Sequence, residues 1–150
     1  MASLVANKET SYSSVLPATD FYPELKISEF QALFHFLEDE TEAGILHCAS
    51  VERIAIHREL KVLTTQYTAL SAYSQTLFDD NVSALTLYKQ AVFCKTAYAL
   101  ITNRLATDAT KEAAGRQEAL MQRADKQLTN YRAAIVSLLP DVSGYTFEMV

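Results

Sequence analysis

The stretch Ile45–Leu60, "ILHCASVERIAIHREL", holds the side chains of this chain best suited to chemistry: two histidines, a cysteine and two glutamates. These residue types are common metal ligands, and they also act as nucleophiles and as general acids or bases. Apolar residues recur here at three- and four-residue steps, which is typical of an amphipathic helix. A metal or catalytic site therefore requires these side chains to converge on one face of that helix.

The two histidines of this stretch cannot share a metal ion. His47 and His57 are ten residues apart, which separates them by about 80° around a helix and about 15 Å along its axis. A zinc pair needs histidines four residues apart, and di-iron bundles repeat a Glu-x-x-His pattern on two helices. No histidine of the sequence has a glutamate three positions before it. We expect histidines at polar edges or helix interfaces, and no metal ion or other cofactor.

The usual patterns of nucleophilic and acid–base catalysis are missing from the sequence as well. It has no G-x-S-x-G motif, and three glycines are too few for a glycine-rich phosphate loop. The acidic run Glu38–Glu42 contains neighbouring carboxylates, but consecutive exposed acids lack the apolar surroundings that separate an acid from a base. We interpret this run as a solvated turn before a helix, and we expect no catalytic residue and no enzymatic activity.

Composition and charge exclude further classes of protein. The 150 residues are 49% hydrophobic with only 3 Gly and 3 Pro, which favours one ordered, mostly helical domain. A net charge of -5 argues against a general nucleic-acid binder. Cys48 and Cys94 have no CxxC spacing, so we expect reduced core cysteines of a cytosolic protein. We expect no signal peptide and no membrane span, since no apolar run reaches about 18 residues.

The distribution of residue types predicts an all-α fold, a helical bundle of about four helices with extended N- and C-terminal arms. Residues 1–24 are rich in Ser and Thr and contain Pro17 and Pro23, so we expect an extended arm that orders on a neighbouring subunit. Residues 25–140 form the helical bundle domain. Residues 141–150 alternate apolar and polar side chains, which predicts a strand-like C-terminal tail.

The first two helices have recognisable start signals. Ser28 and Gln31 fit a capping box, which predicts a short helix running to about Leu37. Thr41 is the expected cap of the second helix, which begins at Glu42 and reaches about residue 65, or continues toward residue 73. Its apolar face is predicted from the residues that repeat at helical steps, Ile45, Val51, Ala55, Ile56, Leu60 and Leu63 among them.

The third and fourth helices follow a break at residues 78–81. The third begins near Ser83 and is apolar on almost all sides, which predicts a central position in the bundle. The fourth begins after Thr107 or Asp108 and ends before Pro140, because proline cannot continue a helix. Gly115 weakens this helix unless close packing requires a glycine there, and we expect such packing.

Two sets of residues are candidates for contacts between subunits. Aromatic residues outside the helical core, Tyr12, Phe21 and Tyr22, bring large contact area at low entropic cost. Arg116 and Arg123, seven residues apart, lie on one face of the fourth helix. Because Glu118 and Asp125 lie on the same helix, one interpretation is a solvated, mixed-charge face. The other is a contact of the two arginines with the acidic turn of a neighbour, Glu38, Asp39 and Glu40.

Three stretches, in their order and separation, resemble one family of phage proteins. "DFYPELKISEFQALFHF", from Asp20, resembles the opening of the head completion (head stabilisation) proteins of contractile-tailed bacteriophages. Ile45–Leu60 is similar to that family's "L..A.......VN.EL" helix, with His57 where Asn is common. "LYKQAVFCKTAYALITNRLATDATKEAAGRQEALMQRADKQLTNYRAAIVSLL", Leu87–Leu139, is similar to its "Y.RAV...A.A.L...Y...D.T..G...AE.L...AD......RAI..L" signature. The acidic turn and the pair Gly44–Ile45 depart from the family pattern.

The resemblance implies a structural virion protein of the head-tail connector type. Such an adaptor binds the portal protein after DNA packaging, stabilises the filled head and provides the docking surface for the tail. The implied partners are the portal protein, neighbouring copies in a dodecameric ring, and a tail terminator or neck protein. Double-stranded DNA is implied only as the passing genome, and no membrane is involved. The implied location is the head-tail neck of the virion, assembled in the host cytoplasm.

The C-terminal tail has an expected role in this assembly. We expect it to anchor on the portal protein, either as an added edge strand or by inserting side chains into pockets. The residues expected to make this contact are Tyr145, Phe147, Met149 and Val150.

The residues alone leave two other classes open. A small cytosolic helical binding module, such as a regulator or a chaperone-like bundle, would use its aromatic arms on a soluble partner and would not bind portal rings. A metalloenzyme bundle would carry bound metal, which metal analysis of the purified protein would detect.

Overall fold

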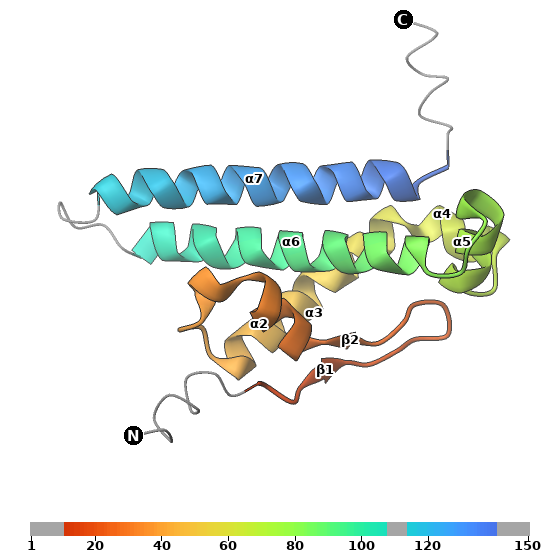
Figure 1. The fold of residues 1–150 in the computed structure, drawn as a ribbon, viewed down its shortest axis with the longest axis horizontal. Helices are drawn as coiled ribbons and strands as arrows, with labels where there is room; N and C mark the ends of the chain where they lie inside the picture. The colour runs from red at the N-terminus through yellow and green to blue at the C-terminus, as the bar shows by residue number, and fades with distance from the viewer. Residues whose placement is uncertain (1–10, 108–113, 141–150) are drawn as a thin grey trace, which may run out of the picture.

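The computed structural model describes residues 11–107 and 114–140, which form three layers (Figure 1). The long helix α6 (Ser83–Thr107) is the middle layer. Helix α7 (Ala114–Leu138) lies antiparallel along one side of α6, and α3 (Glu42–Glu59) crosses the opposite side. The chain is therefore a mainly helical bundle, as the sequence predicts.

Short elements surround this three-layer bundle in the described part of the chain. Helix α2 (Ile27–Leu33) runs into the 3-10 turn η1 (His35–Leu37) beside the start of α3. Helices α4 (Lys61–Gln66) and α5 (Leu70–Phe78) lie at the end where α6 begins. A small antiparallel sheet pairs β1 (Val15–Leu16) with β2 (Leu25–Lys26). Leu16 faces Leu25 in this sheet, and both side chains are 1% exposed.

Helix α6 occupies the centre because it carries apolar side chains on almost all of its sides. Tyr88 and Phe93 are fully buried, and small residues such as Ala91 and Ala97 are buried on other sides of the helix. Small side chains let neighbouring helices approach closely, while the aromatic rings fill the space between layers. The prediction of a central third helix is confirmed.

The turn before α6 fixes where the helix begins. Asp79 has a left-handed backbone (φ 63°), a conformation that ends α5. Asp80 Oδ1 then accepts hydrogen bonds from the backbone N–H groups of Val82 (2.9 Å) and Ser83 (2.6 Å). These bonds satisfy donors at the start of α6 and lower the pKa of the Asp80 carboxyl, with the Ser83 side chain making the largest contribution. The predicted break at residues 78–81 and the start near Ser83 are confirmed.

The second helix differs from its prediction in length and in its buried face. Helix α3 ends at Glu59, where the buried Leu60 redirects the chain into α4. Val51 is 47% exposed and Ala55 is exposed, so these two members of the predicted apolar face point outward. The physical reason is helical geometry: at about 100° per residue, Val51 and Ala55 lie about 140° and 100° around the helix from Ile56, whose face packs in the core.

The predicted helix caps have mixed outcomes. Thr41 Oγ1 accepts a hydrogen bond of 3.0 Å from the backbone N–H of Gly44, which confirms Thr41 as the cap of α3. The capping box at Ser28 is wrong, because α2 begins at Ile27 and its N-cap Lys26 makes no side-chain cap bond. Strand β2 leads directly into α2, and Ile27, the first residue of α2, is buried in the core with 0% exposure.

The N-terminal segment is extended but not loose. Residues 11–24 pack on helices of their own chain, through Leu16 (1% exposed) and Tyr22 (4% exposed) in particular. The sequence predicts that this arm orders on a neighbouring subunit. In the structure, residues 11–24 instead pack within their own chain, because the side chains of Leu16 and Tyr22 are buried there.

Helix α7 ends before Pro140, as predicted, and its last turn is tied to α5. The Tyr73 hydroxyl donates a hydrogen bond of 2.5 Å to the backbone carbonyl of Leu138, one of the carbonyls that a helix end leaves unpaired. The expected close packing at Gly115 is wrong, since a Cβ added there would meet nothing within 4 Å. The predicted start after Thr107 or Asp108 falls in residues 108–113, and these residues and the tail at 141–150 lie outside the described residues.

Candidate functional site

His57, one of the two histidines of the Ile45–Leu60 stretch, belongs to an aromatic cluster between α3 and the hairpin, the segment 14–26 that contains β1 and β2. The ring of His57 stacks on Tyr22, with 3.9 Å between ring centroids and 8° between planes. His57 Nε2 also shares a hydrogen bond of 2.7 Å with the hydroxyl of Tyr88 in α6. His57 thus joins the hairpin, α3 and α6. This is the helix-interface role expected from the sequence for a histidine of this stretch.

Burial in this cluster favours the neutral form of each group. Desolvation, with a smaller contribution from the nearby Arg53 cation, lowers the pKa of His57 to about 4. Desolvation raises the pKa of Tyr22 to about 12 and that of Tyr88 further. The hydroxyl of Tyr22 has no hydrogen-bond partner among the described residues. All three side chains therefore serve packing at neutral pH, and none is poised for proton transfer.

Two further residues of α3 hold the same hairpin. The guanidinium of Arg53 donates a hydrogen bond of 2.7 Å to the backbone carbonyl of Pro17. Near the start of the helix, a carboxylate oxygen of Glu42 accepts a hydrogen bond of 2.8 Å from the backbone N–H of Ser14. Hydrogen bonds from Ser14, its side chain first, lower the pKa of Glu42. Helix α3 therefore anchors the hairpin along most of its length.

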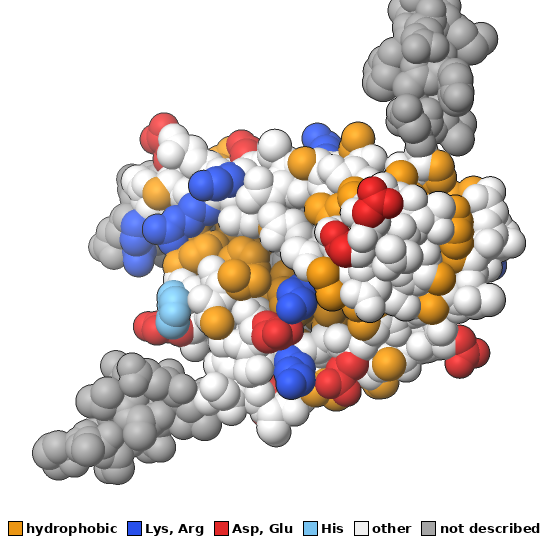
Figure 2. Space-filling view, turned by 45° about the vertical axis from the view of Figure 1, so that its right-hand side comes forward, with side chains coloured by type: hydrophobic (Ala, Val, Ile, Leu, Met, Phe, Trp, Pro, Cys, Tyr) orange, Lys and Arg blue, Asp and Glu red, His pale blue; other side chains and the backbone are white. Residues whose placement is uncertain are grey.

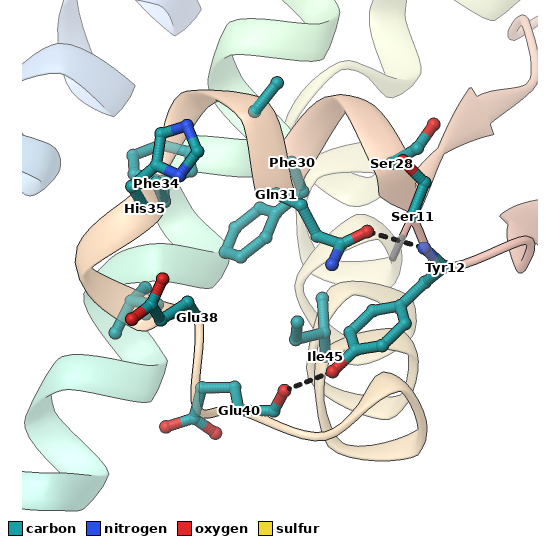
Figure 3. A pocket seen from close by; sticks show the side chains of 12 residues that line it. Ser11, Tyr12, Ser28, Phe30, Gln31, Phe34, His35, Glu38, Glu40 and Ile45 are labelled. Carbon is teal, nitrogen blue, oxygen red and sulfur yellow. Dashed lines mark hydrogen bonds between the residues drawn. The ribbon is translucent and has the colours of Figure 1, made fainter. Parts of the chain in front are cut away.

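Tyr12 spans the mouth of a pocket between α2 and the start of α3 (Figure 3). Its backbone N–H donates to Gln31 Oε1 (2.6 Å), and its hydroxyl donates to the backbone carbonyl of Glu40 (3.0 Å). The cavity is about 340 Å³, with apolar walls from Phe30 and Ile45 and an acidic edge at Glu38. Its lining includes Ser11, Ser28 and His35, but among the described residues no hydrogen bond joins either serine to the histidine, so the pocket offers space for a side chain more than a place for catalysis.

The acidic turn before α3 is paired inside its own chain. Arg104, near the end of α6, donates hydrogen bonds to Asp39 and, at 2.8 Å, to Oε2 of Glu40. A guanidinium can satisfy two carboxylates because its donors form a planar fork. Hydrogen bonds and charges of the two acids raise the pKa of Arg104 in spite of its burial. Asp39 and Glu40 are therefore less available to a neighbouring copy than the sequence predicts. The sequence does not predict that Arg104 is their partner.

Arg116 and Arg123 lie near Arg104 and Asp39, in a groove between the end of α6 and the start of α7. The groove is about 530 Å³ and has an apolar floor at Ala119 and Leu120. The guanidinium of Arg123 lies 4.6 Å from the ring centroid of Phe36, a cation–π contact that orients it. Figure 2 shows Lys and Arg side chains gathered at this end of the molecule beside a hydrophobic patch.

An outward apolar stripe runs along α3 and α4. Val51, Ile54 and Val62 are 47%, 64% and 42% exposed; the first two are three residues apart on α3, and Val62 follows in α4. This spacing places the first two on one face of α3, opposite the side that packs on α6. The stripe is a second surface that suits a protein contact.

The other predicted contact residues have different surroundings. Phe21 is half-buried and packs edge-on against Tyr22. Tyr22 is inside the core of its own chain, so it offers no surface to a neighbour. Glu38 is exposed at the pocket edge. The predicted portal contacts lie outside the described residues: Tyr145, Phe147, Met149 and Val150.

The described ranges, 11–107 and 114–140, contain no group of three or more His, Cys, Asp or Glu residues that could hold a metal ion. Cys94 is buried and Cys48 half-buried, both are free thiols, and desolvation raises the pKa of each to about 11. Such thiols stay protonated and unreactive. In the same ranges, no helix is both long and apolar enough to cross a membrane.

Comparison with known proteins identifies the family of this chain. The family model described as "Phage head completion protein (GPL)" matches residues 16–146 of the chain. No curated protein and no solved structure matches it. The family match begins at Leu16, the second residue of β1, and spans every described helix with the three arginines of the groove, Arg104, Arg116 and Arg123. The chain therefore belongs to the phage head completion protein family, a family of structural components of the virion.

Proposed function

We propose that this protein is an adaptor that binds the portal ring after DNA packaging, stabilises the filled head and offers the tail a docking surface. The observation that carries the proposal is the family match over residues 16–146. Two features of the molecule support it. The histidine and tyrosines of the aromatic cluster and the two cysteines serve packing, which supports a protein that acts by binding rather than by catalysis. Two of its exposed surfaces suit contacts with other proteins, the arginine groove and the stripe on α3 and α4.

The C-terminal tail provides the proposed contact with the portal protein. Residues 141–150 carry Tyr145, Phe147, Met149 and Val150 directly after α7. Aromatic and aliphatic side chains on a short segment make good anchors, because they bury large area for few ordered residues. The portal protein thus receives these side chains in pockets, or pairs with the segment as an added strand.

Contacts between copies complete the proposed dodecameric ring. Every candidate residue for these contacts except Tyr22 keeps some exposure. Tyr12 and Glu38 line the pocket between α2 and α3, whereas Asp39, Arg116 and Arg123 line the groove between α6 and α7, and Phe21 and Glu40 are partly exposed. A ring needs two different faces on each copy, since a heterologous contact joins the face of one copy to another face of the next. The assembled ring stands in the neck of the virion, where the packaged DNA passes through it and a tail terminator or neck protein docks.

Co-sedimentation with purified portal rings tests this function. We expect the full-length chain to bind at one copy per portal subunit, and a chain lacking residues 141–150 to lose most of this binding. Circular dichroism of the shortened chain controls for folding, because the truncation begins after the last described helix. No binding of the full-length chain to an intact portal ring would remove the adaptor function. Full binding of the shortened chain would remove only the proposed role of the tail.

A further inference from the structure

Helix α7 carries opposite charges on its two flanks. Its packed side, centred on the buried Ala124, faces α6. With 100° per residue, Arg116 and Arg123 are about 80–100° to one side of this direction, and Glu118 and Asp125 are about 100–120° to the other. The arginine flank borders the groove, and the acidic flank lies across the helix from it.

All four charged side chains of these flanks are available to a partner. Each of the four residues is exposed. None of them forms an ion pair with another described residue, whereas Arg104 in the same groove is satisfied by Asp39 and Glu40. The stacking of Arg123 on Phe36 holds its guanidinium at the surface without neutralising it. The flanks are therefore charged surfaces for which the described part of the chain offers no ion-pair partner.

The two flanks match each other in spacing and in apolar content. Each pair is seven residues apart, which corresponds to about 10 Å along the helix. Between Glu118 and Asp125 stands Met121, a flexible apolar side chain that is 55% exposed. Between the two arginines the groove has its apolar floor at Ala119 and Leu120. An acidic flank placed against an arginine flank thus aligns two ion pairs with one apolar contact between them.

We propose that the acidic flank of α7 in one copy of this chain docks in the arginine groove of the next copy. The contact joins two different faces, so it is heterologous and can close into a ring. This inference names the surfaces through which copies of the chain meet. That these contacts form a ring rests on the proposed function. A DNA strand would be attracted by the arginines, but it would leave the matching acidic flank unused and would meet Asp39 and Glu40 at the groove edge.

Charge reversal on one flank at a time tests the contact. The variant R116E/R123E has two acidic flanks, and the variant E118R/D125R has two basic flanks. Each variant alone places like charges against each other, which we expect to weaken self-association at low salt by at least about tenfold. An equimolar mixture restores a complementary contact at every junction, and so does the four-fold variant that exchanges both charge pairs within one chain.

A matched control separates this contact from the effect of net charge. The variant R58E/K61E makes the same change in charge as R116E/R123E, at exposed positions in the last turn of α3 and the first turn of α4. We expect this control to associate like the wild type. Sedimentation velocity at low and high salt measures the association, without portal rings. The same variants are then bound to portal rings, and the copies bound per ring are counted.

The outcomes separate the contact from the adaptor function. Loss of association in each single-flank variant, with recovery in the mixture, supports the proposal. It is overturned if both single-flank variants associate and fill portal rings like the wild type, or if their mixture fails to recover. Loss of binding to a 24-base-pair DNA in R116E/R123E with unchanged self-association would also overturn it, in favour of DNA contact. Failure of every chain to bind portal rings removes the adaptor function, while the mixing result still decides the contact.

Discussion

The outer helices α3 and α7 both carry charged side chains, but they use them in opposite ways. On α3, Glu42, Arg53 and His57 each find a partner in the hairpin or α6. On α7, Arg116 and Glu118 are exposed and form no ion pair with a described residue. Partners within the chain indicate a role in folding stability, while exposed charges with matched spacing indicate a role between chains. Mutations should separate the two roles.

Replacing Tyr22 tests the folding role where the expected effect is largest. Tyr22→Ala removes a 96% buried ring from its stack on His57, and the cavity should lower the free energy of unfolding by about 3–5 kcal/mol. Tyr22→Phe is the matched control, because it removes only a buried hydroxyl without a described partner and keeps the ring. We expect it to be neutral or stabilising by about 1 kcal/mol. Urea unfolding measures both, and equal losses in the two variants would contradict the packing role.

Acid should weaken the hairpin's attachment through His57. Its folded pKa of about 4 lies below the ordinary value of about 6.5, so the unfolded chain binds the proton more readily. The stability is fully present above pH 6.5, falls as the pH drops toward 4, and is lost below that. Because His57 is only half-buried, we expect a loss of about 1–2 kcal/mol. In His57→Asn, unfolding measured between pH 7 and 4 should lose this slope, and a persistent slope would assign it to other groups.

Removing Arg104 should have a smaller effect that depends on salt. Arg104→Ala leaves Asp39 and Glu40 without their shared partner, and we expect a loss of about 1 kcal/mol at low salt. Arg116→Ala, on the same groove but without a described ion pair, should change stability by less than about 0.5 kcal/mol. Thermal unfolding at low and high salt compares the two. A salt-independent loss in Arg104→Ala would point to lost packing rather than lost charge.

Filling Gly115 is expected to have the smallest effect. An added Cβ meets nothing within 4 Å and the backbone is helical without a positive φ. Gly115→Ala should therefore raise the free energy of unfolding by about 0.5 kcal/mol, since alanine loses less backbone entropy on folding. Chemical unfolding checks this, and a destabilised variant would show that the glycine has a role in the assembled ring or in contacts outside the described residues.

The sequence predicts those features that depend on neighbouring residues. Thr41 as a helix cap and the start of α6 near Ser83 follow from local hydrogen-bonding rules, and both are present. The central place of α6 follows from its apolar composition. The family match reflects the order of many such local patterns along the chain.

Features that depend on distant residues could not be predicted. Arg104 meets Glu40 across 64 residues, and Arg53 meets Pro17 across 36. Packing on α6 decides which apolar residues of α3 are buried, so Ile45 and Ile56 are inside while Val51 is 47% exposed. No local pattern reports a crossing angle or a partner that far away. The sequence could supply the charges of the α7 flanks, but the packed side of the helix, which separates the flanks, comes from the structure.

The most direct test of the division between α3 and α7 measures folding and association in one variant. Unfolding and sedimentation velocity are recorded for R116E/R123E beside the wild type, at the same low salt concentration. We predict a free energy of unfolding within about 0.5 kcal/mol of the wild type, together with loss of self-association. A marked fall in stability, or association equal to the wild type, would contradict the claim that these charges serve contacts between copies.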